Sequence, residues 1–129
     1  MSIERVSIQS AHILEGVLKK SQSDRGVVIC HPHPLYGGSM NNNVVYAIEE
    51  GFYAKGFTTL RFNFRGVGSS NGYYDEGDGE VDDLVASVEF LKTDNPINRI
   101  FRERNTDNLV KIYSNNATNL DPDMIYKLI

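Results

Sequence analysis

The sequence has one cysteine, Cys30, and no tryptophan among its 129 residues. A single thiol excludes a disulfide framework and a zinc site built from cysteine pairs. No apolar run is long enough to span a bilayer, and the N-terminus does not begin one. Lysines and arginines form no basic patch, and the net charge of −4 argues against a nucleic-acid partner. These absences predict a cytoplasmic protein of one domain, bound to neither membrane nor nucleic acid.

The most informative stretch covers residues 26–40 and reads GVVICHPHPLYGGSM. Its apolar residues 27–30 are typical of a strand buried on both faces. Two prolines end that strand, and two glycines then allow a sharp turn or a close backbone approach. Ser39 and Asn41 are suitable N-cap residues for a following helix. Open α/β sheets bind ligands at such loops, and a helix N-terminus suits an anion or a developing oxyanion.

Hydrophobic periodicity predicts the remaining elements. They are an edge hairpin of strands at 6–8 and 13–18, a helix at 42–55, a strand at 57–64, a glycine-rich loop at 65–79 and a helix ending near 93–96. The first helix should bury one face (Val44, Val45, Ile48 and Phe52), and so should the second (Val81, Leu84, Val85, Val88 and Leu91). The strand–helix–strand order predicts parallel pairing with a right-handed crossover.

The composition changes beyond Pro96, where asparagine becomes frequent and glycine is absent. This change predicts a boundary near residue 96, with residues 1–96 as one unit and residues 97–129 as a divergent tail. Within the tail, a short strand is predicted at 109–113 and a short helix at 124–129.

Two segments carry a family resemblance. GVVICHPHPLYGGSMNN, followed by GFTTLRFNFRGVGSSNGYYDEGDGEVDDLVASVEFL, resembles a bacterial predicted-hydrolase family of the α/β-hydrolase superfamily. Its relatives are dienelactone-hydrolase-like and acyl-peptidase-like proteins. The similarity covers roughly residues 16–91 and implies an α/β fold with a mostly parallel, eight-stranded sheet and flanking helices. It further implies hydrolysis of ester, thioester or peptide-type acyl groups, with no cofactor and no metal.

The resemblance also implies a role for residues 31–40 (HPHPLYGGSM), here called the HPHP loop, which supplies one oxyanion-hole N–H near Leu35 and Tyr36. In intact relatives this loop would face a small-molecule acyl substrate. We therefore expect six substrate-binding residues: His31, His33, Leu35, Tyr36, Gly37 and Gly38.

The second half of the family pattern is missing from this sequence. In that fold the next strand ends in a G-x-S-x-G nucleophile elbow, and an acid and a histidine follow it. Here residues 99–119 read RIFRERNTDNLVKIYSNNATN, and no histidine follows His33. We assign no catalytic residue and expect an inactive chain, truncated before the elbow by gene decay or a frameshift.

One string inside the glycine-rich loop, GSSNG at residues 68–72, does match G-x-S-x-G. Because residues 73–78 separate it from the next helix, it lacks the strand–turn–helix order of an elbow. A surface loop is the simpler interpretation, although a partnership of Ser70 with His31 or His33 stays open.

Two other function classes stay open. His31 and His33 could ligate a metal in a metal-dependent hydrolase, if further ligands converge on them. Alternatively, the chain is a non-enzymatic binding or assembly module completed by a partner strand, because truncation would expose the edge of the strand at 27–30. The strand at 109–113 could then cover that edge; otherwise the chain is partly disordered or pairs with another polypeptide. Arg61 and Arg65 are suited to an anion, but we expect pairing with nearby Asp75 or Glu76.

Overall fold

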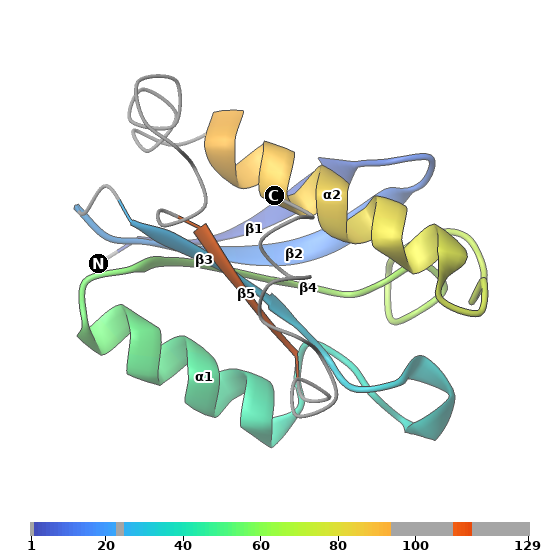
Figure 1. Ribbon diagram of the computed structural model, residues 1–129, viewed down its shortest axis with the longest axis horizontal. Coiled ribbons are helices and arrows are strands. Elements are labelled where there is room, and N and C mark those ends of the chain that lie inside the picture. Colours follow the sequence, from blue (N-terminus) through green and yellow to red (C-terminus); the bar gives the residue numbers. More distant parts are fainter. Residues whose placement is uncertain (1, 23–24, 94–109, 115–129) are drawn as a thin grey trace.

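The computed structural model describes residues 2–22, 25–93 and 110–114. These residues form one five-stranded sheet in the order β1-β2-β4-β3-β5, with α1 on one face and α2 on the other (Figure 1). The elements are β1 (Ser2–Gln9), β2 (Ile13–Lys20), β3 (Gly26–Cys30), the 3₁₀ turn η1 (Pro34–Tyr36), α1 (Asn43–Ala54), β4 (Thr58–Phe62), α2 (Asp78–Thr93) and β5 (Val110–Ser114). The predicted α/β class with flanking helices is confirmed.

The sheet is mixed. β1 pairs with β2, and β2 with β4, in antiparallel fashion, whereas β3 runs parallel to both β4 and β5. The edge hairpin and the parallel β3–α1–β4 crossover are thus confirmed, but the prediction of a mostly parallel sheet is wrong for the described strands. The reason is that the hairpin enters the sheet through an antiparallel contact with β4, so it adds two antiparallel pairings.

β5 covers the edge of β3. The two strands pair in parallel from Gly26↔Val110 to Cys30↔Ser114, one residue beyond the strand predicted at 109–113. Because the chain itself occupies this edge, the structure gives no support to a partner polypeptide that fills it. The helix predicted at 124–129 and the boundary at residue 96 lie outside the described residues.

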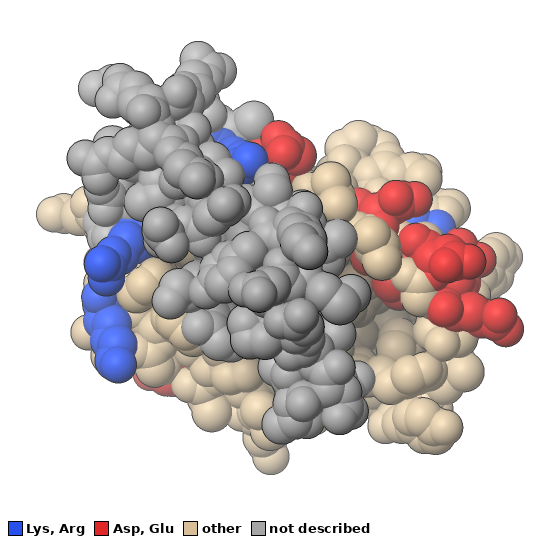
Figure 2. Space-filling model, viewed as in Figure 1, with Lys and Arg blue, Asp and Glu red and all other residues tan. Residues whose placement is uncertain are grey.

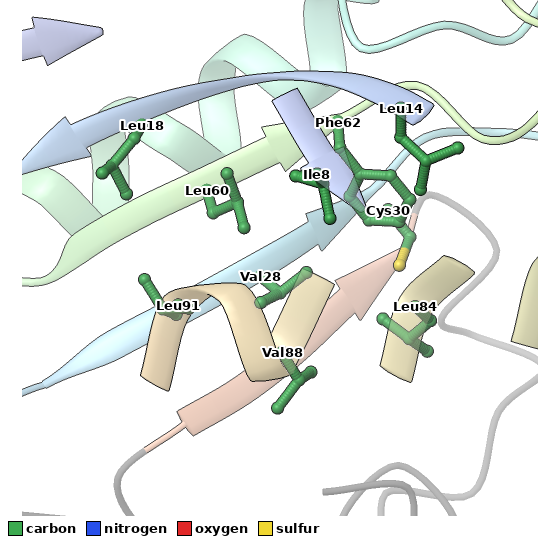
Figure 3. Close-up of a cluster of buried hydrophobic side chains, with 10 residues drawn as sticks. All are labelled: Ile8, Leu14, Leu18, Val28, Cys30, Leu60, Phe62, Leu84, Val88 and Leu91. Atoms are coloured by element: carbon green, nitrogen blue, oxygen red, sulfur yellow. The ribbon is translucent and has the colours of Figure 1, made fainter. Parts of the chain in front are cut away.

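Apolar side chains form two clusters, one on each face of the sheet. The larger lies under α2 and contains Ile8, Leu14, Leu18, Val28, Cys30, Leu60, Phe62, Leu84, Val88 and Leu91 (Figure 3). The smaller lies under α1 and contains Val27, Ile29, Val45 and Phe57. Since side chains alternate along a strand, β3 contributes residues to both clusters, which explains its unbroken apolar run.

α1 begins later than the sequence suggests. Its N-cap is Asn42, whose side-chain oxygen accepts a hydrogen bond from Val44 N at 2.8 Å, rather than Ser39 or Asn41. With this start, Val45 is fully buried but Val44 is 51% exposed, contrary to prediction.

α2 also buries a narrower stripe than predicted. Leu84, Val88 and Leu91 are buried, whereas Val81 and Val85 are 43% and 38% exposed. A helix on one side of a sheet contacts it along a limited arc, so apolar residues at the margin of that arc stay in solvent. Neither helix in the described part of the chain is both long and apolar enough to cross a membrane.

Thr58 and Thr59, adjacent residues of β4, differ in whether their hydroxyl groups are hydrogen-bonded, and we expect their substitution to change stability in opposite directions. Thr59 is fully buried and its Oγ1 has no hydrogen-bond partner among the described residues. Thr58 Oγ1 accepts from Ser21 N at 3.0 Å and donates to Ser21 O at 3.3 Å. Removing an unpaired buried hydroxyl relieves its desolvation cost and so stabilises the fold. Removing a paired hydroxyl leaves its hydrogen-bond partners unsatisfied and so destabilises the fold.

We therefore expect Thr59→Val to raise the free energy of unfolding by up to about 1 kcal/mol, and Thr58→Val to lower it by about 1–2 kcal/mol. Urea unfolding followed by circular dichroism measures both. Equal losses for the two variants would show that Thr59 Oγ1 is satisfied in solution.

Candidate functional site

His31, the first residue after β3, joins the ends of two strands. Its Nε2 accepts a hydrogen bond from Phe64 N at 3.1 Å, and its Nδ1 lies 2.7 Å from Pro32 O. An acceptor Nε2 assigns the proton to Nδ1, which then donates to the Pro32 carbonyl. The ring is only 3% exposed and packs edge-on against Phe64. His31 therefore fixes the start of the HPHP loop relative to the end of β4.

Burial lowers the pKa of His31, partly offset by its hydrogen bond to Pro32 O. The folded protein consequently resists a proton that the unfolded chain accepts near the ordinary pKa of 6.5. The contribution of His31 to stability is thus intact above about pH 6.5 and declines as the pH falls below it.

We expect the slope of unfolding free energy against pH below pH 6.5 to be smaller in His31→Asn than in the natural sequence, by at most about 1.4 kcal/mol per pH unit. Urea unfolding at a series of pH values gives the slopes. His12→Asn, a change in the β1–β2 turn, is the matched control. Parallel curves for His31→Asn and the natural sequence would contradict the assignment.

His33 organises the next part of the loop. Its Nδ1 accepts from Leu35 N at 3.1 Å, and its carbonyl accepts from Tyr36 N at 3.1 Å and Gly38 N at 3.2 Å. The resemblance implies one oxyanion-hole N–H near Leu35 and Tyr36, and in the structure the N–H groups of both residues are hydrogen-bonded to His33. The side chains of Leu35 and Tyr36 point into solvent, at 66% and 86% exposure.

Gly37 and Gly38 require glycine for different reasons: Gly37 because of its backbone conformation, and Gly38 because of the space around it. Gly37 has φ 78°, a left-handed conformation, but open space around it. A Cβ on Gly38 would lie 1.9 Å from Pro32 O, far inside van der Waals contact. The loop therefore folds back on its own start, and Gly38 is where its two arms meet.

The loop of residues 65–72 is tied to the HPHP loop through Asn63 and Glu15. Asn63 Oδ1 accepts from Met40 N at 2.8 Å, and Asn63 Nδ2 donates to Glu15 Oε1. Glu15 Oε1 also accepts from Ser69 N at 2.7 Å. Sequence reasoning missed both Asn63 and Glu15; the available signal, for Asn63 alone, was a polar residue directly after a buried strand. Together they hold both loops at the carboxyl ends of β3 and β4.

Ser70 belongs to this framework. It is 7% exposed, and its Oγ donates to Asn63 O at 2.7 Å and accepts from Glu15 N at 2.9 Å. Neither His31 nor His33 is among its partners. Ser70 therefore has a structural role and is buried, unlike the surface loop that the sequence suggested.

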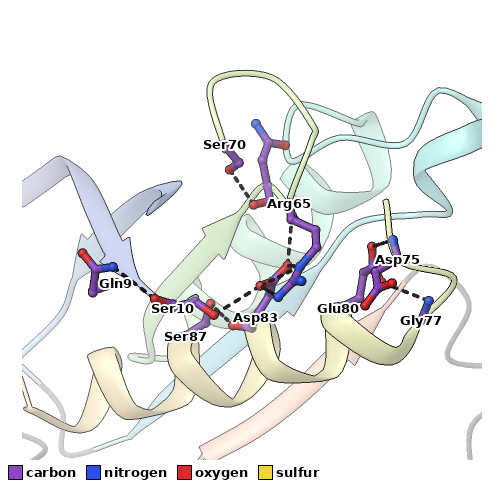
Figure 4. A network of polar contacts seen from close by, with 10 residues as sticks. Gln9, Ser10, Arg65, Ser70, Asp75, Gly77, Glu80, Asp83 and Ser87 are labelled. Carbon is purple, nitrogen blue, oxygen red and sulfur yellow. Dashed lines mark hydrogen bonds and ion pairs between the residues drawn. The ribbon is translucent and has the colours of Figure 1, made fainter. Parts of the chain in front are cut away.

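The arginines at this edge pair differently from the prediction. Arg65 makes a bidentate ion pair with Asp83 of α2, with Nη2–Oδ1 at 2.9 Å and Nε–Oδ2 at 3.1 Å (Figure 4). These hydrogen bonds raise the pKa of the Arg65 guanidinium, against the effect of burial. Arg61 pairs with Glu49 of α1 at 2.8 Å. Asp75 and Glu76 were the expected partners; instead the backbone N–H of Asp75 donates to Glu80 at 3.0 Å.

The described residues offer no group of three or more histidine, cysteine or acidic side chains suited to a metal. His31 Nε2 and His33 Nδ1 already accept backbone N–H groups, at 3.1 Å each. Cys30 is buried, and burial raises the pKa of its thiol to about 12, so it is not a thiolate at neutral pH. The geometry thus gives the metal alternative no support.

Comparison with known proteins finds no matching family model. The uncharacterized protein RP471 of Rickettsia prowazekii is 46% identical over 85 residues, which are 64% of this chain and 36% of that protein. An α/β serine hydrolase homologue from Coxiella burnetii is 36% identical with a TM-score of 0.71, covering 88% of this chain and 51% of its own. A lidless α/β serine hydrolase from Xanthomonas campestris is 28% identical with a TM-score of 0.69, covering 88% and 50%. The chain spans about half the length of these solved structures and about a third of the Rickettsia protein.

Proposed function

We propose that this chain, whose fold matches about half of each of two α/β serine hydrolase structures and which resembles them in sequence, forms the substrate-binding side of an acyl-hydrolase site. In such a site a serine attacks the acyl carbon, backbone N–H groups hold the oxyanion, and a histidine acts as base. The ligand would be a small molecule with an ester, thioester or amide group.

One observation carries the proposal. Hydrogen bonds to the residues after β4 hold the HPHP loop in a fixed turn at the carboxyl ends of the parallel strands β3 and β4. Ligands bind at this end of open α/β sheets. His31 positions the loop and Gly38 permits its return, so neither needs to touch the ligand. Leu35 and Tyr36 present their side chains to it.

The oxyanion role of Leu35 and Tyr36 requires an exchange of hydrogen bonds. Their N–H groups are bonded to His33 at 3.1 Å in the structure. An oxyanion is a stronger acceptor than a neutral imidazole or carbonyl, so it would compete successfully for one of them. Gly37, in open space between this pair and Gly38, gives the loop the freedom for a small shift.

We further propose that the sequence as it stands does not hydrolyse esters. Ser70 is engaged on both sides of its hydroxyl, and the sequence has no histidine beyond His33. A serine without an adjacent base is a weak nucleophile.

A fluorophosphonate probe tests this proposal, because it labels only activated serines. We expect no stoichiometric labelling of the purified chain, with an active serine esterase as the positive control. Labelling that is lost in Ser70→Ala would overturn the structural role of Ser70. Labelling at any other serine, mapped by mass spectrometry, would show that the chain contains its own nucleophile.

A further inference from the structure

We propose that the cluster of His33, Tyr36 and Tyr74 binds a quaternary ammonium group on the ligand. The inference rests on the proposed function, because it names a substrate class for the same edge of the sheet. It comes from the packing of the three rings, from the hydrogen bond between two of them, and from the charge around them.

The three rings come from two loops and meet at His33. Its ring centroid lies 4.9 Å from that of Tyr36 and 5.1 Å from that of Tyr74, with both pairs tilted. Tyr36 is 86% exposed, so its ring stays open to solvent. Tyrosine faces attract cations through the ring quadrupole, and clustered rings are how proteins recognise quaternary ammonium groups.

Two polar atoms of the cluster, His33 Nε2 and Tyr74 Oη, are hydrogen-bonded to each other. Since His33 Nδ1 accepts from Leu35 N, the neutral ring carries its proton on Nε2, which donates to Tyr74 Oη at 3.0 Å. The histidine therefore offers a ligand neither a free donor nor a free acceptor. A cation without N–H groups needs ring faces and negative charge rather than hydrogen-bond acceptors, and it fits this surface better than an ammonium or a guanidinium group.

The charge around the cluster is negative. Residues 66–91 contain seven acidic residues and no lysine or arginine. The nearest cation in sequence, Arg65, is already neutralised by Asp83 at 2.9 Å. Acidic residues gather on the right of the molecule in Figure 2, and Figure 1 places the HPHP loop below them in the same view. An approaching cation would therefore be attracted to this edge.

This negative charge acts on the cluster itself. The pKa of the Tyr74 hydroxyl is raised, first by desolvation and then by the charges of Glu80 and Glu76. Glu80 is held by the N–H groups of Asp75 and Gly77 at 3.0 Å and 2.9 Å. Two carboxylates are thus close enough to Tyr74 to influence a charge placed beside its ring.

Glu76 adds a backbone argument. Glu76 has a backbone φ of 54°, and no other non-glycine residue among those described has a positive φ. This conformation is uncommon for a residue with a Cβ, and it is tolerated where the surroundings or a function require it. Here it places an exposed carboxylate two residues after Tyr74.

The test compares choline with 3,3-dimethylbutan-1-ol, a neutral molecule of the same shape, at constant ionic strength. Amide chemical shifts of the ¹⁵N-labelled chain are followed during titration. We expect saturable shifts at residues 33–38 and 73–76 with choline, and at least tenfold weaker binding of the neutral molecule. Equal affinity for the two, or no saturable shift with choline, would overturn the inference.

Variants identify the parts of the site. Tyr36→Leu should weaken choline binding about two- to fivefold, the worth of one exposed cation–π contact, whereas Tyr36→Phe should retain it. Glu76→Gln should weaken binding about twofold at low salt, with the difference vanishing at 1 M NaCl. Tyr73→Leu is the matched control, since Tyr73 is 87% exposed but makes none of the described ring contacts with His33. If Tyr73→Leu weakens binding as much as Tyr36→Leu, the proposed cluster is not the site.

Two further ligands separate the failure of this inference from that of the proposed function. Guanidinium binding in place of choline would overturn the choice of a quaternary cation. If a neutral acyl compound such as ethyl acetate binds at residues 33–38 and choline does not, the inference is wrong and the proposed function stands. If neither binds there, both are wrong.

Discussion

Asp83→Ala is expected to lower the free energy of unfolding by about 3–5 kcal/mol, because it leaves the buried Arg65 guanidinium without its counter-charge. Asp83 is fully buried, and Arg65 is 7% exposed. The carboxylate also accepts from Arg65 N at 2.9 Å, so the substitution strands a backbone N–H as well. Urea unfolding followed by circular dichroism measures the loss.

Asp82→Ala is the matched control for Asp83→Ala. Asp82 is the preceding residue of α2 and is exposed. An exposed surface substitution of this kind should change stability by no more than about 0.5 kcal/mol. If the two variants lose the same stability, the ion pair does not hold α2 to the end of β4. Should Asp83→Ala fail to fold, Asp83→Asn, which keeps one acceptor oxygen, is expected to show a smaller loss.

Gly38→Ala has the second largest expected effect, a loss of about 3 kcal/mol, at the upper end for overpacking. Its new methyl group would start 1.9 Å from Pro32 O and 2.8 Å from His33 O, and both obstacles are backbone atoms that a rotamer change does not move. The two arms of the HPHP loop would have to separate. We therefore also expect faster amide hydrogen exchange across residues 31–40 in this variant.

Gly51→Ala gives the opposite result and serves as the control. Gly51 lies within α1, and a Cβ there has open space within 4 Å. Alanine in a helix interior is worth about 1 kcal/mol over glycine, so this variant should gain stability. If Gly38→Ala were as harmless as Gly51→Ala, the HPHP loop would be far more pliable in solution than its packing indicates.

The local order of elements could be read from the sequence because each is encoded within a short window. The apolar run of β3, the prolines that end it, and the glycine after α1 depend only on neighbouring residues. Parallel pairing of β3 with β4 followed from the intervening helix. The mixed character of the sheet was not accessible in this way, because it depends on which strand the hairpin joins.

Residue roles at the candidate site were less accessible. The sequence directed attention to the HPHP loop, but it could not separate His31, which is buried and joins two strands, from His33, which lies within an aromatic cluster. The two histidines are two residues apart in similar local contexts. Their different environments come from β4 and the loop after it, more than thirty residues further along the chain.

By itself, the sequence determined the α/β class, the loop at the carboxyl end of β3, and the lack of any histidine after His33. The tertiary structure alone decided that Arg65 pairs with Asp83, that Asn63 meets Glu15, and that Tyr74 meets His33, across 18, 48 and 41 residues. Hydrophobic periodicity specifies which face of a helix or strand is apolar. It therefore predicts features within one element and not the contacts between elements. A polar contact is chosen by strand register and helix placement, which are fixed only when the whole chain packs.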